Sequence, residues 1–147
     1  MESHLNPKYY VPEINEFHIG FEYEYEDINE SGSTTSWYKT IVKENECYII
    51  DQHLKYSDNL NLRVKYLSRE DIESLGWFHR YDDFSFGEFL KSKNGEVDYH
   101  LTFDYENKSL IIGLYNNEDT EFYDNIFIGI IKNKSEFIKL LKQLKIE

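Results

Sequence analysis

Residues 66–77 have the sequence Tyr-Leu-Ser-Arg-Glu-Asp-Ile-Glu-Ser-Leu-Gly-Trp and contain the clearest structural signals in the chain. Ser68 follows an apolar, strand-like run and is a residue type that caps the first amide groups of a helix. Acidic side chains occupy the next positions, where the positive end of the helix dipole favours carboxylates. Gly76 can adopt the left-handed conformation that ends a helix, and Trp77 returns the chain to the core. This stretch therefore predicts a strand, a short helix over about residues 68–75 and a second, aromatic strand.

A second helix is predicted at the C-terminal end, over about residues 134–145. Asn133 is a suitable N-cap, and Glu136 stands three residues later, as in a capping box. Apolar residues follow with the spacing of one helix face, and lysines occupy the other face. The apolar set is Phe137, Ile138, Leu140, Leu141 and Leu144, and the lysines are Lys139, Lys142 and Lys145.

Most of the remaining chain has the alternation that is typical of β-strands. Phe17–Glu26 alternates apolar with polar residues, the period of a half-buried antiparallel strand. The turn at Lys93-Asn94-Gly95 indicates a hairpin, because Asn-Gly favours a tight two-residue turn. Further strands are predicted at 37–42, 46–51, 62–66, 86–90, 97–105, 110–115 and 122–131.

We therefore expect a single α+β domain over residues 1–147. A mostly antiparallel, twisted β-sheet forms its centre, and the short helix and the C-terminal amphipathic helix pack on it. Residues 1–15, which include both prolines, are expected to form an extended lead-in.

The formal net charge of the 147 residues is -12. Such an acidic field repels nucleic acid and anionic membranes and attracts a basic partner protein. Residues 132–147 are an exception, with five lysines and two glutamates. Direct nucleic-acid binding is thus disfavoured outside this segment. The alternative is that the charge only keeps an aromatic-rich domain in solution.

Cys47 is the single cysteine, which excludes an internal disulfide framework and fits a reducing compartment. Its neighbours are acidic and raise the pKa of a thiol, so a buried structural role is favoured over a nucleophile. The N-terminal residues lack the features of a signal peptide, and no run of about 18 apolar residues is present. We expect a cytoplasmic protein without a membrane segment.

Three carboxylates share one face of the strand predicted over residues 17–26, at Glu22, Glu24 and Glu26. Strand geometry separates successive members by about 7 Å. An unpaired row of this kind is repulsive and requires a cation, a cross-strand lysine or the arginines of a partner. We expect this glutamate row to bind the partner, together with Asp27 and Glu30 in the adjoining loop. Aromatic anchors beside it are expected at Tyr81 and Tyr123.

No catalytic residue, cofactor or metal site is assigned from the sequence, because the five histidines lack the spacing of a zinc site. One enzymatic alternative is a small metal-dependent hydrolase or nuclease. It requires the polar faces of two strands to be neighbours, so that four residues cluster: His18, Glu22, His100 and Asp104. A phage structural or assembly protein, which would form a stable homo-oligomer, is a further alternative.

Two stretches, residues 68–77 and residues 131–146, resemble a group of uncharacterised small acidic proteins from phages and prophages of Bacteroidota. An N-terminal run like residues 12–24 (Pro-Glu-Ile-Asn-Glu-Phe-His-Ile-Gly-Phe-Glu-Tyr-Glu) also occurs in that group. The resemblance follows the same order along most of the chain and includes no catalytic motif. It implies a mobile-element context in a bacterial host cell, where small acidic proteins often act by binding. Inhibitors of CRISPR effectors are one such class.

These observations together favour a non-enzymatic, acidic interaction protein of phage type. It is expected to bind a basic nucleic-acid-handling protein and to inhibit it. An RNA-guided CRISPR nuclease is the partner that the resemblance implies.

Overall fold

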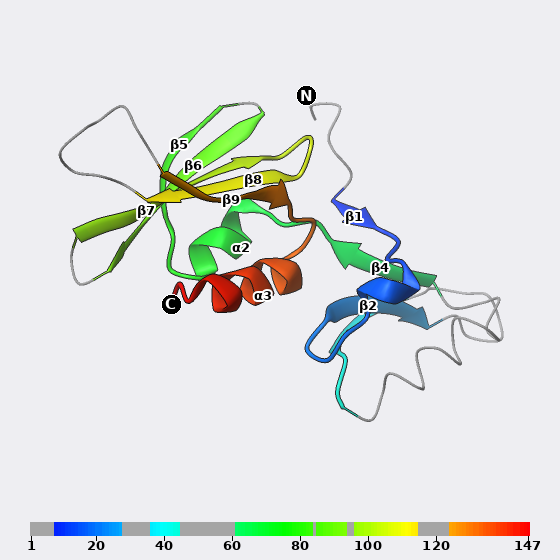
Figure 1. Cartoon of the computed structure of the whole chain (residues 1–147). Coiled ribbons are helices and arrows are strands. Elements are labelled where there is room, and N and C mark those ends of the chain that lie inside the picture. The colour runs from blue at the N-terminus through cyan, green and yellow to red at the C-terminus, as the bar shows by residue number, and fades with distance from the viewer. Residues whose placement is uncertain (1–7, 28–35, 45–60, 84, 94–95, 115–123) are drawn as a thin grey trace. The chain divides into compact units, whose positions relative to one another are not determined.

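The computed structural model describes residues 8–27, 36–44, 61–83, 85–93, 96–114 and 124–147, which form two antiparallel sheets and two α-helices (Figure 1). Contacts within the chain divide it into two compact units. Among the described residues, one unit contains 67–137, and the other contains 8–66 together with 138–147. The boundary falls inside the C-terminal helix, after Phe137. Each unit has its own sheet.

The first unit in the chain contains a four-stranded sheet in the order β1-β4-β2-β3, in which every neighbouring pair is antiparallel. A short 3-10 helix, η1 (Ile14–Glu16), lies between β1 and β2 in the sequence. Phe21, Val42 and Val64 form the buried cluster of this unit. The strands are β1 (Tyr9–Tyr10), β2 (Glu22–Asp27), β3 (Ser36–Ile41) and β4 (Asn61–Lys65).

The second unit contains a five-stranded antiparallel sheet in which the strands follow the chain order, β5-β6-β7-β8-β9. Alternate residues of the central strands are fully buried on one side of this sheet, among them Phe89, Leu101 and Ile112. Figure 1 draws α2 beside this sheet. The strands are β5 (Phe78–Asp82), β6 (Phe86–Lys93), β7 (Glu96–Asp104), β8 (Ser109–Leu114) and β9 (Asp124–Ile130).

Helix α2 (Arg69–Ser74) begins where the sequence predicts. The Ser68 hydroxyl accepts a hydrogen bond from the Asp71 N–H, and the Asp71 carboxylate accepts from the Ser68 N–H, so the two residues form a capping box. Gly76 ends the helix with a φ of 84°, which is the conformation expected of it. Trp77 is buried and lies 6.2 Å from the Phe137 ring, between the ring centroids.

Helix α3 (Lys134–Leu144) also agrees with its predicted range. Asn133 is buried, and its side-chain oxygen accepts a hydrogen bond from the Glu136 N–H at 2.9 Å. The Glu136 carboxylate accepts from the N–H of Lys132 at 2.6 Å. Asn133 therefore caps the helix. In a capping box the Glu136 carboxylate accepts from the N–H of the N-cap residue, whereas this bond comes from the preceding residue, Lys132.

The mostly antiparallel α+β fold is confirmed, but the expectation of one sheet is wrong, because the strands form two. The first predicted strand is also too long, since β2 begins at Glu22 and not at Phe17. A turn precedes it, in which the Phe21 N–H donates to the His18 carbonyl at 2.9 Å and Gly20 has a φ of 86°. This left-handed glycine interrupts the strand, so Ile19 is exposed although it continues the apolar alternation.

Other sequence predictions have mixed outcomes. The predicted hairpin is confirmed by the antiparallel pairing of β6 with β7, in which Lys93 lies opposite Glu96, while Asn94 and Gly95 lie outside the described residues. The predicted extended lead-in contains β1 and η1 in its described part. The strand predicted at 46–51, with Cys47, lies outside the described residues. Neither described helix is long and apolar enough to cross a membrane.

Replacing the cap of α2 tests this local structure. Ser68→Ala removes the hydroxyl that accepts from the Asp71 N–H, and we expect the free energy of unfolding to fall by about 1 kcal/mol. Chemical denaturation measures the change. Ser85→Ala, at an exposed position outside the helices, is the control and should leave the midpoint nearly unchanged. Equal losses in the two variants would contradict a capping role for Ser68.

Candidate functional site

The glutamate row predicted from the sequence lies on one face of β2, in the four-stranded sheet. Glu22, Glu24 and Glu26 alternate with Tyr23 and Tyr25, and successive side chains of a strand point to opposite faces. Tyr23 packs against the buried cluster of this unit, so the glutamates occupy the outer face of the sheet.

Each glutamate of the row has a polar partner on a neighbouring strand. Glu22 forms an ion pair with Lys39 of β3 at 2.7 Å, and Glu24 forms one with Arg63 of β4 at 2.5 Å. Glu26 accepts a hydrogen bond from the Asn61 amide at 2.8 Å. The repulsion within the row is thus relieved by cross-strand partners of the same sheet, which is one of the solutions that the sequence allows.

The two ion pairs differ in exposure. The side chains of Lys39 and Glu22 are 63% and 35% exposed, whereas those of Arg63 and Glu24 are 27% and 23% exposed. An exposed lysine–carboxylate pair contributes little to stability and is easily exchanged. Glu24 is therefore mainly a support for Arg63, and Glu22 is the more accessible carboxylate.

Arg63 lies between two aromatic rings on this face. Its guanidinium carbon is 3.9 Å from the centroid of the Tyr9 ring and 3.9 Å from the centroid of the Trp37 ring. Both distances are well inside the range of cation–π attraction. The Tyr9–Arg63–Trp37 stack joins β1, β4 and β3, and the ion pair with Glu24 fixes the guanidinium from β2.

Sequence reasoning did not find this stack. Its three residues come from segments 26 or more positions apart, and no local pattern relates them. A partial signal exists, because an isolated arginine within the short strand predicted at 62–66 needs a partner on a neighbouring strand. The register that supplies the partner is visible only in the sheet, where Glu24 is paired with Arg63 and Lys39, and Glu26 with Trp37.

The other binding residues predicted from the sequence are Asp27, Glu30, Tyr81 and Tyr123. Asp27 ends β2 and pairs with Ser36, while Glu30 and Tyr123 lie outside the described residues. Tyr81 is on β5, in the unit with the five-stranded sheet, where it is 52% exposed. Its ring lies 6.2 Å from that of Phe86, measured between centroids.

The residues of the metal-dependent alternative belong to two different sheets. Glu22 is on β2, whose neighbours are β3 and β4, whereas His100 and Asp104 are on β7, whose neighbours are β6 and β8. This alternative required the two strands to be neighbours, and they are not paired, because β2 and β7 belong to different sheets. His18 precedes β2, and its Nδ1 lies 2.9 Å from the Glu16 carbonyl oxygen. Within the described part of the chain, no group of three or more His, Cys, Asp or Glu residues is arranged to hold a metal ion.

Asp104 has a structural task at the end of β7. Its carboxylate accepts hydrogen bonds from the backbone N–H groups of Glu106 and Asn107, both at 2.9 Å, and so closes the turn to β8. Burial acts to raise the pKa of Asp104, but the hydrogen bonds from Asn107 and Glu106 outweigh it and lower the pKa.

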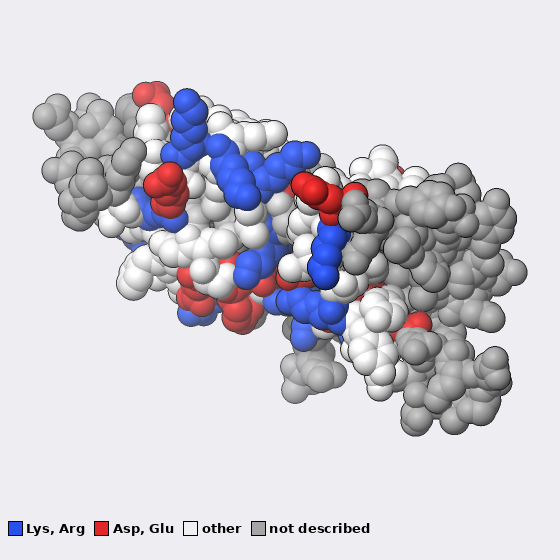
Figure 2. Space-filling view, turned by 90° about the horizontal axis from the view of Figure 1, so that it is seen from below, with Lys and Arg blue, Asp and Glu red and all other residues white. Residues whose placement is uncertain are grey.

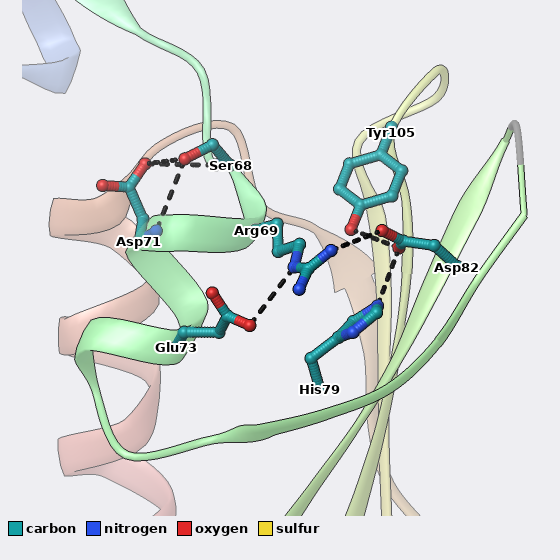
Figure 3. Close-up of polar contacts among 7 residues, drawn as sticks. All are labelled: Ser68, Arg69, Asp71, Glu73, His79, Asp82 and Tyr105. Atoms are coloured by element: carbon teal, nitrogen blue, oxygen red, sulfur yellow. Dashed lines mark hydrogen bonds and ion pairs between the residues drawn. The ribbon is translucent and has the colours of Figure 1, made fainter.

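A polar cluster surrounds Asp82 at the end of β5 (Figure 3). Its carboxylate accepts from the Tyr105 hydroxyl at 2.9 Å and lies 3.4 Å from the Arg69 guanidinium and 3.2 Å from His79 Nε2. Arg69 also pairs with Glu73, one turn along α2, at 3.2 Å. Burial and the bond to Asp82 raise the pKa of the Tyr105 hydroxyl, which stays protonated as the donor. The cluster joins α2 to β5 and to the turn that follows β7, so we assign it a structural role.

His100 is buried at the middle of the five-stranded sheet, with Nε2 3.8 Å from the Glu88 carboxylate. Burial lowers the pKa of His100, and Glu88 offsets this only in part. The histidine is therefore neutral near pH 7 and unsuited to hold a fixed positive charge.

The lysines predicted on the outer face of α3 are exposed at Lys139, Lys142 and Lys145. Figure 2 shows Lys and Arg side chains with Asp and Glu side chains interspersed among them. Lys134, at the start of the helix, donates to the Ser74 hydroxyl at 2.9 Å.

Comparison of the chain with protein-family models, with curated proteins and with solved structures found no match.

Removing the planar cation from the stack tests its contribution. Arg63→Lys keeps the charge but loses the flat guanidinium that lies against both rings, so we expect the free energy of unfolding to fall by about 1–2 kcal/mol. Denaturant unfolding followed by circular dichroism measures the loss. Arg80→Lys, at an exposed position, is the matched control, and an equal loss there would contradict the proposed importance of the stack.

The environment of His100 predicts a pH dependence. A histidine whose pKa is lowered in the folded state contributes stability that is present above the unfolded value of 6.5 and lost as the pH falls. We expect the free energy of unfolding to decrease on acidification below pH 6.5, and His100→Gln to reduce this decrease. Because the Glu88 carboxylate raises the pKa, Glu88→Gln should make the acid loss larger. Denaturation midpoints measured across this range would contradict the assignment if all three proteins changed in parallel.

Proposed function

We propose that the protein is a non-enzymatic interaction protein that binds a basic surface of a nucleic-acid-handling protein and inhibits it. The observation that supports this proposal is the outer face of the four-stranded sheet, where the glutamate row lies beside the Tyr9–Arg63–Trp37 stack. We call this surface the stack face.

The stack face contains the residue types that dominate protein interfaces. Tryptophan, tyrosine and arginine are the side chains in which binding energy is most often concentrated. Here they hold one another in place through contacts at 3.9 Å and through the ion pair with Glu24. A partner would lose little side-chain entropy in ordering them, so a larger part of the contact energy would appear as affinity.

The charge of the chain indicates a basic partner. At a net charge of -12, long-range attraction favours a positively charged surface and increases the rate of encounter. At short range, a partner's arginine can replace the exposed Lys39 at Glu22 with little loss of folding stability. Glu26 provides a second carboxylate on the same face. Glu24 has the different task of holding Arg63.

A basic surface that binds an acidic protein is often one that also binds nucleic acid. Neutralisation of phosphates by lysine and arginine supplies much of nucleic-acid affinity, so an acidic protein on the same surface competes for it. The resemblance to phage and prophage proteins supports a partner in the cytoplasm of a bacterial host. An RNA-guided CRISPR nuclease is the partner class that we propose.

The decisive experiment is a pull-down in which the protein is the bait. It uses lysate of a bacterial host that carries its own antiphage defence systems, at roughly 0.15 M and 0.5 M salt. We expect a basic nucleic-acid enzyme to be retained at low salt and released at high salt, and its purified form to lose activity when the protein is added. The double variant Glu22→Gln/Glu26→Gln and the single variant Trp37→Ala should each lose the partner. Glutamine is preferable to lysine here, because a charge reversal at Glu22 would place a lysine beside Lys39 and disturb the sheet.

The matched control is Glu106→Gln/Glu147→Gln, which makes the same charge change at exposed positions outside the strands of the four-stranded sheet. It should retain the partner at low salt. The proposal is overturned if the folded stack-face variants bind as well as the unchanged protein, or if bound partner leaves the nuclease fully active.

A further inference from the structure

Strand β9 lies at the edge of the five-stranded sheet. It pairs with β8 on one side, and within the described residues no strand pairs with its other side. Ile128 and Ile130 are each 66% exposed, and they point to the same face because they are two residues apart. Two large apolar side chains on a strand edge are an unusual feature for a chain of net charge -12.

The ladder between β8 and β9 shows which backbone groups of the edge point away from β8. The Ile131 N–H donates to the Lys108 carbonyl at 2.9 Å, and this bond flanks the pair Ser109–Ile130. In an antiparallel ladder, such a bond identifies the enclosed pair as one without hydrogen bonds of its own. The N–H and C=O of Ile130 therefore point away from β8, and those of Ile128, two residues earlier, do so as well.

This edge has little protection against pairing. Natural edge strands are blocked by charged side chains, proline or bulges. The segment 127–131, Phe-Ile-Gly-Ile-Ile, contains no charge and no proline. The shift in register near Ile112 and Gly113 faces only the beginning of β9, at residues 125–127.

We propose that β9 pairs with β9 of a second copy of this chain. In an antiparallel pair with its two-fold axis at Gly129, Ile128 of each copy lies opposite Ile130 of the other copy. The N–H and C=O groups of these residues, which point away from β8, then form four hydrogen bonds across the axis. The four isoleucines make one apolar strip beside Ile111, which is the neighbour of Ile128 on β8. The contact is closed, since the same patch serves both copies.

Charge favours this segment over other parts of the surface as the place of self-association. Two chains of net charge -12 repel one another, so any contact between them must avoid placing acidic side chains opposite each other. The uncharged segment 127–131 meets this requirement in the proposed register. The remaining repulsion acts at longer range and is screened by salt. Salt should thus strengthen self-association, whereas it should weaken binding to the basic partner.

The experiment measures the mass of the full chain in solution by sedimentation equilibrium, as a function of protein and salt concentration. We expect a reversible change from 17.8 kDa to twice that mass, with the change moving to lower protein concentration as salt is added. Ile128→Lys places like charges near each other across the axis and should raise the dissociation constant about tenfold or more. Phe78→Lys is the control, because Phe78 is 73% exposed on β5, at the opposite edge of the same sheet.

Hydrogen exchange supplies a second readout that does not depend on a variant. The amides of Ile128 and Ile130 should become more protected as the protein concentration rises. A 17.8 kDa mass at every concentration overturns the proposal, as does a dimer that Phe78→Lys weakens as strongly as Ile128→Lys. Amides of Ile128 and Ile130 that become protected only when another protein is added would also overturn it, and would assign the edge to a strand of that protein.

Discussion

One backbone hydrogen bond, from the Leu67 N–H to the Lys132 carbonyl oxygen at 2.7 Å, lies where both helices begin. The next residue on one side is Ser68, which caps α2, and the next on the other side is Asn133, which caps α3. Leu67 and Asn133 are both buried. Because a buried amide must find an acceptor, this contact sets the point at which the chain leaves each preceding strand and turns into a helix. The two segments that precede the helices, 65 residues apart in the sequence, are thereby joined at the points where the helices begin.

The features that the sequence predicts well are those decided by adjacent residues. The caps at Ser68 and Asn133, the glycine that ends α2 and the Asn-Gly hairpin each depend on a few neighbouring positions. The division into two sheets could not be predicted, because β4 lies between β1 and β2 in space while residues 28–60 separate it from β2 in the sequence. Strand order of this kind depends on tertiary contacts, which alternation does not encode. The early start predicted for β2 failed because Gly20 can interrupt a strand without changing the apolar pattern.

The candidate site shows the same limit at the level of side chains. The period of a strand predicts that Glu22, Glu24 and Glu26 share a face, and they do. It does not predict their partners, which come from two other strands in a register that only the sheet defines. The consequence for function is substantial. A row that appears in the sequence as bare negative charge is, in the folded chain, a set of carboxylates that each have a polar partner on a neighbouring strand.

The two tryptophans occupy contrasting surroundings, and this gives the protein two separate optical probes. Trp77 is 2% exposed and lies in the core of the unit with the five-stranded sheet, so its emission reports whether that core is intact. Trp37 lies against a guanidinium on the surface of the other unit, where a neighbouring cation affects the excited indole. Replacing either residue with phenylalanine leaves a chain with a single tryptophan, whose emission can be excited apart from that of the tyrosines. Events at the stack face and events in the core can then be followed separately, without an attached label.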